Sequence, residues 1–201
     1  MRLKIVSHPY IQLAKKTIET YIKAGKVIPL SGDLSEEFPC GELVELFNRK
    51  AGTFVTIMKD GQLRGCIGTY LPTKEDIGKE IISNAIAAAT EDYRFGPIRE
   101  EELPHLSYTV YILGEPELVK AIKELDPKKY GIIVKTIPIK GPTGIDVVFN
   151  GHFVAKTGLL LPDLEEVDTV EKQISIACQK GGIDPVREKI LIYKFTVEKY
   201  Q

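Results

Sequence analysis

The chain has 201 residues, of which 43% are hydrophobic and 27% charged, and its formal net charge is −1. This length allows a buried core without metals or disulfides, and the near-zero charge argues against broad binding of nucleic acid or anionic membranes. No apolar run approaches the roughly 20 residues that a membrane-spanning helix needs, and residues 1–16 lack a signal-peptide pattern. We expect one cytoplasmic domain over residues 1–201, with a smaller lobe at about 117–166.

The cysteines and histidines are too few and too scattered for a framework. Three of each are spread along the chain without the spacing of a disulfide set or a zinc site. We therefore predict no metal site, and the sequence names no cofactor. Scarce Asn and Gln with abundant Lys, Glu and Ile favour a heat-adapted source.

The first predicted element is an amphipathic helix over residues 9–24, where apolar side chains recur at helical spacing. Ser7 is placed to cap it, Pro9 suits its first turn, and Gly25 suits its end. Residues 26–41 are rich in proline and glycine, which predicts a long irregular connection.

A β-hairpin follows at residues 53–70. Residues 53–58 are rich in β-branched and large apolar side chains, which favour a strand. Asp60 and Gly61 form the pair preferred in a two-residue hairpin turn. The expected cross-strand pairs are Lys59 with Gln62, Ile57 with Arg64, and Val55 with Cys66. Because strand side chains alternate between faces, we expect Arg64 and Cys66 on the face of Val55 and Ile57, and Leu63 and Ile67 on a core face with Phe54 and Met58.

Cys66 is the candidate reactive residue of this hairpin. Gly65 and Gly68 flank it, and glycines inside a strand often mark a bulge or close approach by a backbone or ligand. We expect open space beside Cys66 and a cation, Arg64, that favours the thiolate. The alternative is structural: the cysteine packs as a small hydrophobe and the glycines admit a helix.

A second helix is predicted after Pro72, with Thr73 and Asp76 forming a capping box. Its expected buried face consists of Ile77, Ile81, Ala85 and Ala88. The loop after it contains Asp92 and Arg94, which fit either a structural ion pair or an anion-binding site. Residues 100–102, three glutamates, are expected to be a solvated face.

The second half of the chain mixes strands with short helices. We predict strands at 107–113, 132–137 and 191–197, helices at 118–125 and after Asp168 or Thr169, and a hairpin turn at Asn150-Gly151. Strands and helices do not alternate as repeated βαβ units. The fold class is therefore α+β, with largely antiparallel sheet, packed helices, and one main lobe plus a smaller lobe.

Four segments resemble the AMMECR-type domain family in the family's order. They are Leu63-Arg64-Gly65-Cys66-Ile67-Gly68, Asp92-Tyr93-Arg94-Phe95-Gly96-Pro97-Ile98, Gly158-Leu159-Leu160-Leu161-Pro162 and Cys178-Gln179-Lys180-Gly181-Gly182. The resemblance implies a two-part α+β fold with the hexapeptide near a cleft, and no known reaction. It also implies possible pathway partners, a Memo-like and a radical-SAM protein. Tyr93 stands where the family has proline, and residues 135–151 are longer than its usual connection.

Three functions follow from these residues, and whether the chain is an enzyme stays open. The first is binding of a small anionic ligand or a partner by Arg64, Asp92, Arg94 and the backbone N–H groups of Gly65 and Gly68. The second is a thiol-dependent enzyme or enzyme subunit with Cys66 as nucleophile and Arg64 as its partner. The third and weakest is RNA association. It would rest on Lys128, Lys129, Tyr130, Lys135 and Lys140.

Overall fold

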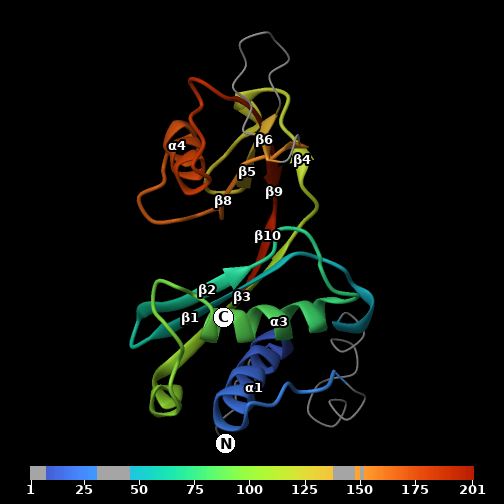
Figure 1. Ribbon diagram of the computed structural model, residues 1–201, viewed down its shortest axis with the longest axis vertical. Coiled ribbons are helices and arrows are strands. Elements are labelled where there is room, and N and C mark those ends of the chain that lie inside the picture. Colours follow the sequence, from blue (N-terminus) through green and yellow to red (C-terminus); the bar gives the residue numbers. More distant parts are fainter. Residues whose placement is uncertain (1–7, 31–45, 138–147, 150–151) are drawn as a thin grey trace, which may run out of the picture. The chain divides into compact units, whose positions relative to one another are not determined.

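A computed structural model describes residues 8–30, 46–137, 148–149 and 152–201 (Figure 1). The helices are α1 (Pro9–Ala24), α3 (Ile77–Thr90) and α4 (Val170–Lys180), with 3-10 helices at Glu100–His105 and Ile122–Glu124. The strands are β1 (Thr53–Lys59), β2 (Gln62–Gly68), β3 (Leu106–Leu113), β4 (Glu117–Leu118), β5 (Gly131–Ile137), β6 (Val148–Phe149), β7 (His152–Phe153), β8 (Thr157–Leu160), β9 (Lys189–Phe195) and β10 (Val197–Tyr200).

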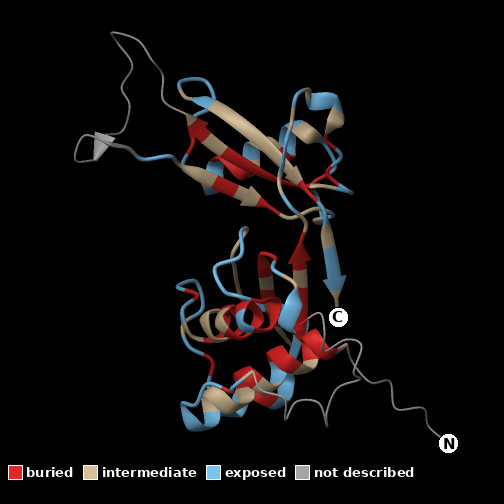
Figure 2. Cartoon of the chain, turned by 90° about the vertical axis from the view of Figure 1, so that its right-hand side faces the viewer, coloured by how far each residue is buried: buried red, intermediate tan, exposed pale blue. Residues whose placement is uncertain are grey.

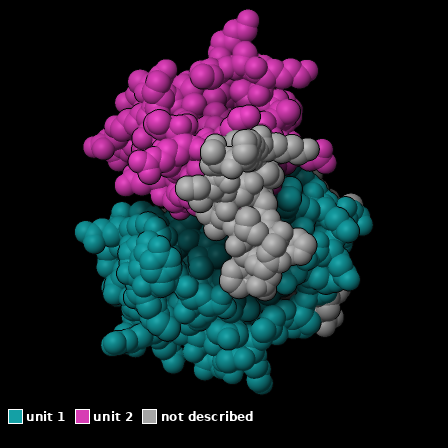
Figure 3. Space-filling model, turned by 45° about the horizontal axis from the view of Figure 1, so that its top comes forward, with its two compact units in different colours: residues 1–113, 198–201 teal, residues 114–197 magenta. Residues whose placement is uncertain are grey.

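The chain divides into two compact units, which Figure 3 shows in different colours. Unit 1 comprises residues 1–113 and 198–201, and unit 2 comprises residues 114–197. The lobe limits of about 117 and 166 stay a prediction from the sequence. The described strand pairs of both four-stranded sheets are antiparallel and each unit carries helices, so the predicted α+β class is confirmed.

Helix α1 forms over the predicted residues, but its cap differs from the prediction. The Nδ1 atom of His8 accepts the backbone N–H of Tyr10 at 3.3 Å, so His8 is the N-cap. Ser7, the predicted cap, lies outside the described residues. Gly25 ends the helix with a φ of 66°, the left-handed conformation that a side chain would disfavour.

The sheet of unit 1 has the strand order β10-β3-β1-β2, which makes β2 an edge strand. Helix α3 packs against β1 and β2, and α1 packs against α3 (Figure 1). Figure 2 shows buried residues concentrated where these helices face one another and the sheet. The fully buried side chains include Val55 and Ile57 of β1 and the predicted helix residues Ile77, Ile81 and Ala85.

The loop before α3 is organised by a buried carboxylate. Asp76 caps α3 by accepting the backbone N–H of Lys79 at 2.7 Å. Thr73 does not cap the helix as predicted, because its N–H and hydroxyl both bind the carboxylate of Glu80. Glu80 is only 1% exposed and also accepts the N–H of Lys74 at 2.7 Å and the hydroxyl of Thr69 at 2.6 Å.

Unit 2 holds a second four-stranded sheet in the order β4-β9-β5-β8, with α4 packed against β5 and β8. Thr169 caps α4, one of the two predicted caps, by accepting the N–H of Lys172. The helix predicted at 118–125 is wrong, because strand β4 and a 3-10 turn at Ile122–Glu124 occupy it. The turn Asn150-Gly151 lies outside the described residues, although β6 and β7 on either side pair as a hairpin.

Each unit contains the same kind of close packing, in which a glycine of an edge strand lies against a backbone carbonyl of a helix. A Cβ atom at Gly65 of β2 would lie 2.2 Å from the carbonyl oxygen of Ala88 in α3. One at Gly158 of β8 would lie 1.8 Å from the carbonyl oxygen of Ala177 in α4. Both glycines therefore allow a helix backbone to approach more closely than any side chain permits.

Among the described helices, none combines the length and the apolar character that crossing a bilayer requires.

Candidate functional site

A β-bulge at Arg64 sets the geometry of the candidate site. The turn at Asp60-Gly61 and the pair Lys59–Gln62 are as predicted, and Met58 pairs with Leu63. The next pair is Ile57 with Gly65, so Arg64 is the extra residue of β2. A bulge places two residues of one strand opposite a single residue of its partner. Each later side chain of β2 therefore lies on the opposite face of the sheet from the one that a regular register predicts.

The predicted pairs Ile57–Arg64 and Val55–Cys66 are therefore wrong. Cys66 lies opposite Thr56, on the sheet face away from the fully buried Val55 and Ile57. The predicted core face of Leu63 and Ile67 with Phe54 and Met58 is also wrong, since Leu63 is 40% exposed and Ile67 pairs with Val55.

The predicted open space at the glycines is filled. At Gly65 the carbonyl of Ala88 occupies the place of a side chain, and this is the helix approach that the structural alternative described. At Gly68 a Cβ atom would lie 2.2 Å from the carbonyl oxygen of Thr53 and 2.3 Å from the ring of Phe54. Ligand binding by the N–H groups of Gly65 and Gly68 stays a prediction.

Asp92 and Arg94 meet Cys66 at the outer edge of β2. The carboxylate of Asp92 accepts the backbone N–H of Cys66 at 2.9 Å, and Nη2 of Arg94 donates to the carbonyl of Cys66 at 3.4 Å. Arg94 also donates to Asp92 from Nε at 2.9 Å and from Nη2 at 2.7 Å. Three of the predicted site residues thus form one hydrogen-bonded group.

The charge of Asp92 is stabilised in this position. Its side chain is 4% exposed, yet the pKa of the carboxyl is lowered from 3.8 to about 2. The side-chain hydrogen bond from Arg94 is the main cause, and the N–H groups of Cys66 and Arg94 add to it against the cost of burial. Asp92 is therefore ionised at neutral pH and fixes the guanidinium of Arg94.

The thiol of Cys66 lies among polar neighbours on the half-buried face. The hydroxyl of Thr56 donates to Sγ of Cys66 at 3.1 Å. Burial raises the pKa of the Tyr111 phenol, and the nearby charge of a Cys66 thiolate raises it further, while the Thr56 hydroxyl opposes both. The same thiolate charge contributes to the raised pKa of Arg94, after the larger effect of Asp92.

Arg64 is bound to other groups than the thiol. Its Nε and Nη2 donate to the two carboxylate oxygens of Glu102, both at 2.9 Å. Its Nη1 donates to the carbonyl of Gly96 at 3.0 Å, and Nη2 also donates to that of Pro97 at 3.1 Å. All three nitrogens of the fork are engaged, and the side chain is 15% exposed. Arg64 therefore holds the far end of the loop that Asp92 begins.

Glu102 is not the solvated residue that the sequence indicated. Its side chain is 12% exposed, and its pKa is lowered from 4.5 to about 2, chiefly by the hydrogen bond from Arg64. The backbone N–H of Arg99 and the ammonium of Lys59 also bind it. Glu101, by contrast, is 70% exposed, as expected.

The remaining cysteines and histidines do not join this site in the part of the chain that the structure describes. Cys178 is 2% exposed in the core of unit 2, and burial raises the pKa of its thiol. The His105 side chain is 58% exposed, with Nδ1 3.4 Å from the carboxylate of Asp60. Cys40 lies outside the described residues, and the described His, Cys, Asp and Glu side chains form no group of three placed to hold a metal.

Comparison with known proteins identifies the chain's relatives. The family model described as AMMECR1 matches residues 11–200. The chain belongs to the AMMECR1 family. A Thermotoga maritima protein is 48% identical over 198 residues, which cover 98% of this chain and 99% of that protein. A Clostridium acetobutylicum protein is 40% identical over 96% of this chain, but the match spans 36% of its own length.

A solved structure shares the fold of this AMMECR1-family chain. The crystal structure of an uncharacterized Pyrococcus horikoshii protein resembles this chain with a TM-score of 0.75 and 30% identity, over 96% of this chain and 89% of that one. Several relatives come from heat-loving organisms, which fits the composition.

The AMMECR1 motifs alone did not reveal Thr56, Glu102 and Tyr111. Thr56 follows from the register once a bulge is placed at Arg64, and the two glycines of the hexapeptide are the sequence signal for such a bulge. Tyr111 pairs with Phe54 across β1 and β3, two places from Thr56, which a sequence pattern cannot align. Glu102 is brought to Arg64 by the loop between α3 and β3.

Proposed function

We propose that this AMMECR1-family protein binds a small carboxylate or phosphate ligand at the guanidinium of Arg94, beside the thiol of Cys66. The supporting observation is the difference between the two arginines. Arg64 has all its nitrogens bonded, whereas the Arg94 side chain is 44% exposed. Among the described residues, Nη1 of Arg94 has no hydrogen-bond partner. The ligand role expected for Arg64 therefore passes to Arg94, and Arg64 positions the loop.

The surroundings of Arg94 suit a guanidinium that binds a ligand by directed hydrogen bonds more than by net charge attraction. Asp92 neutralises much of the guanidinium charge and holds its plane, so a ligand would be selected by directed hydrogen bonds. The guanidinium carbon of Arg94 lies 5.1 Å from the centroid of the Phe95 ring, which is partly exposed, and the neighbouring Tyr93 is 94% exposed. Binding by such a site is expected to be weak for a bare inorganic ion.

A titration of isotope-labelled protein with inorganic phosphate and with acetate at constant ionic strength tests this proposal. The Nε signal of Arg94 is expected to shift saturably, and Arg94→Gln is expected to abolish the shift. Cys66→Ser, which keeps the backbone bonded to Asp92, is expected to bind normally. Normal binding by a folded Arg94→Gln protein, or loss in Cys66→Ser alone, would contradict it.

A second candidate is the thiol-dependent enzyme or enzyme subunit, favoured by the 3.1 Å hydrogen bond from Thr56 to the sulfur. A donor aimed at sulfur and a nearby guanidinium stabilise the thiolate, which is the nucleophilic form. Iodoacetamide modification of Cys66 at pH 7 should then be at least tenfold faster than modification of free cysteine. A rate at or below that of free cysteine would remove this candidate. A cytoplasmic location, where thiols stay reduced, belongs to the same proposal.

RNA association is supported least. Lys128 is paired with Asp168 at 3.1 Å and lies 3.8 Å from Asp163, and Lys140 lies outside the described residues.

A further inference from the structure

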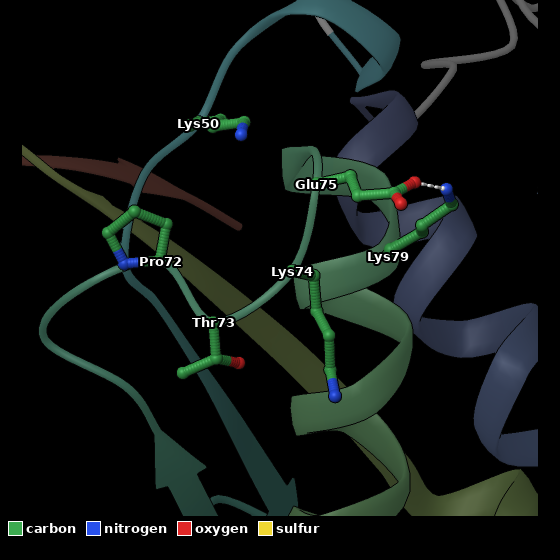
Figure 4. Close-up of a pocket in the computed structure, with 6 residues that line it drawn as sticks. All are labelled: Lys50, Pro72, Thr73, Lys74, Glu75 and Lys79. Carbon is green, nitrogen blue, oxygen red and sulfur yellow. Dashed lines mark hydrogen bonds and ion pairs between the residues drawn. The ribbon is translucent and has the colours of Figure 1, made fainter.

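Two hollows on the surface of unit 1 meet at the same pair of lysines. One has a volume of about 680 Å³ and is polar; Lys50, Pro72, Thr73 and Glu75 border it together with Lys74 and Lys79 (Figure 4). The other has a volume of about 340 Å³ and is mainly apolar. Its lining also includes Lys74 and Lys79, so the two hollows border the same two lysines.

The polar hollow carries more positive than negative charge. Lys79 is paired with Glu75, as the dashed line in Figure 4 shows, and lies 3.6 Å from Asp76. Lys50 and Lys74 have no ion-pair partner among the described residues. Of these two, only Lys74 also lines the apolar hollow, so one ammonium group without an ion-pair partner is available where the two hollows meet.

Lys74 is held at a fixed place. Its backbone N–H and that of Thr73 both donate to the buried carboxylate of Glu80, each at 2.7 Å. Figure 4 shows the Lys74 side chain extending along α3. A cation on an ordered loop binds an anion with less loss of conformational freedom than one on a mobile loop.

The apolar hollow is lined by α3 and by the segment that follows α1. Ile82, Ser83 and Ile86 come from the helix, and Val27 and Leu30 from the segment. Val27 is 59% exposed, so this hydrocarbon surface is open to solvent. Its volume is near the lower end of small-molecule sites, which fits a short chain.

From these two hollows we infer that unit 1 has a second binding site, for a single-chain amphiphilic carboxylate. The carboxylate lies against Lys74, and the hydrocarbon chain lies along Ile82 and Ile86. An inorganic anion would leave the apolar hollow in water, and a neutral hydrocarbon would leave the ammonium of Lys74 without a partner. This site is independent of Arg94.

Octanoate is the probe for this site, used at constant ionic strength below its micelle concentration. We expect saturable shifts of the backbone amide signals of Lys74, Ser83 and Ile86 in a nuclear magnetic resonance titration. Hexanoate should bind more weakly, by roughly fourfold for each methylene that is buried. Octanol, which has the chain without the charge, should bind several-fold more weakly than octanoate.

Three variants test the site. Lys74→Glu should weaken octanoate binding by roughly fivefold or more, because it replaces an attraction by a repulsion. Ser83→Leu, which introduces a better helix former and fills the apolar hollow, should weaken it about tenfold. Lys172→Glu, at a lysine of unit 2 that is exposed like Lys74, is the matched control and should change it less than twofold.

The inference is overturned if octanoate causes no saturable shift at millimolar concentration, or if Lys74→Glu weakens binding no more than Lys172→Glu. Equal affinities of hexanoate and octanoate would also overturn it, and this chain-length series decides the question in wild-type protein if Ser83→Leu does not fold.

Discussion

The carboxylate of Asp92 accepts the backbone N–H of Cys66 at 2.9 Å, across 26 residues of sequence. This bond ties the loop after α3 to the edge of β2, and Arg94 adds a second tie at the carbonyl of Cys66. The hexapeptide of β2 and the segment at 92–98 are therefore one structural assembly. Substitutions in either should affect both.

The first prediction concerns acid stability. The pKa values of Asp92 and Glu102 are both lowered to about 2 in the folded protein. Groups with lowered pKa values stabilise the fold above their unfolded pKa, and that stabilisation disappears as the pH falls toward the folded value. We expect the free energy of unfolding, measured in urea, to fall between about pH 4.5 and pH 2, by about 2 kcal/mol for each group.

Variants separate the two groups in that measurement. Asp92→Asn should lower stability at pH 7 and flatten the acid dependence by one group's share. Glu101→Gln, at a neighbouring carboxyl that is 70% exposed, should leave the profile unchanged. An Asp92→Asn profile parallel to the wild type would show that this carboxyl does not contribute.

The second prediction is that Arg64→Lys destabilises the protein by about 2 kcal/mol at pH 7. An ammonium cannot reproduce the paired bonds to Glu102 together with those to Gly96 and Pro97, so part of the carboxylate becomes unsatisfied. Amide hydrogen exchange at residues 92–98 should accelerate. Arg99→Lys, at a side chain that is 79% exposed, serves as the control, and equal effects of the two variants would refute a special role for Arg64.

The third prediction is that Gly65→Ala costs about 3 kcal/mol, since its Cβ atom would lie 2.2 Å from the carbonyl oxygen of Ala88 and the helix backbone would have to move. Gly25→Ala has open space but a φ of 66°, so it should cost only about 1 kcal/mol. Thermal or urea unfolding of both variants distinguishes a clash from backbone strain. Similar costs would argue that α3 adapts easily.

The fourth prediction concerns the order of thiol modification. Cys66 is half-buried, whereas Cys178 is 2% exposed and burial raises the pKa of its thiol. Iodoacetamide at pH 7 should modify Cys66 in the folded protein and Cys178 only in urea, as read by mass spectrometry of the peptides. Modification of Cys178 at the same rate as Cys66 would show that α4 opens readily.

Local signals in the sequence were sufficient for much of the fold. The limits of α1 followed from Pro9 and Gly25, and the first hairpin turn from Asp60-Gly61, because these residues fix backbone angles by themselves. The helix predicted at 118–125 was wrong, because the apolar spacing there suits a short helix, whereas Glu117 and Leu118 pair with β9 from a distant part of the chain.

The sequence was sufficient to predict which residues form the site, but not how their side chains are arranged. Cys66, Asp92 and Arg94 are brought together, but one extra residue at Arg64 reverses the face on which Cys66 lies. The alternation of apolar and polar residues cannot locate such a bulge, because the alternation stays regular on either side of the extra residue. The sequence did not reveal Glu102 as the partner of Arg64, because residues 100–102 are three successive glutamates with nothing to distinguish them. In the structure, the carboxylate of Glu102 binds Arg64.

The tie between Asp92, Arg94 and Cys66 also bears on how copies of the protein behave toward each other. An uncovered sheet margin recruits extended segments from other molecules and can start fibril growth. At Cys66 both outward-facing main-chain groups are already taken by charged side chains of the same chain. Asp92 and Arg94 therefore also protect this edge strand from pairing with other molecules. A chain that lacked them would be more prone to aggregate through β2.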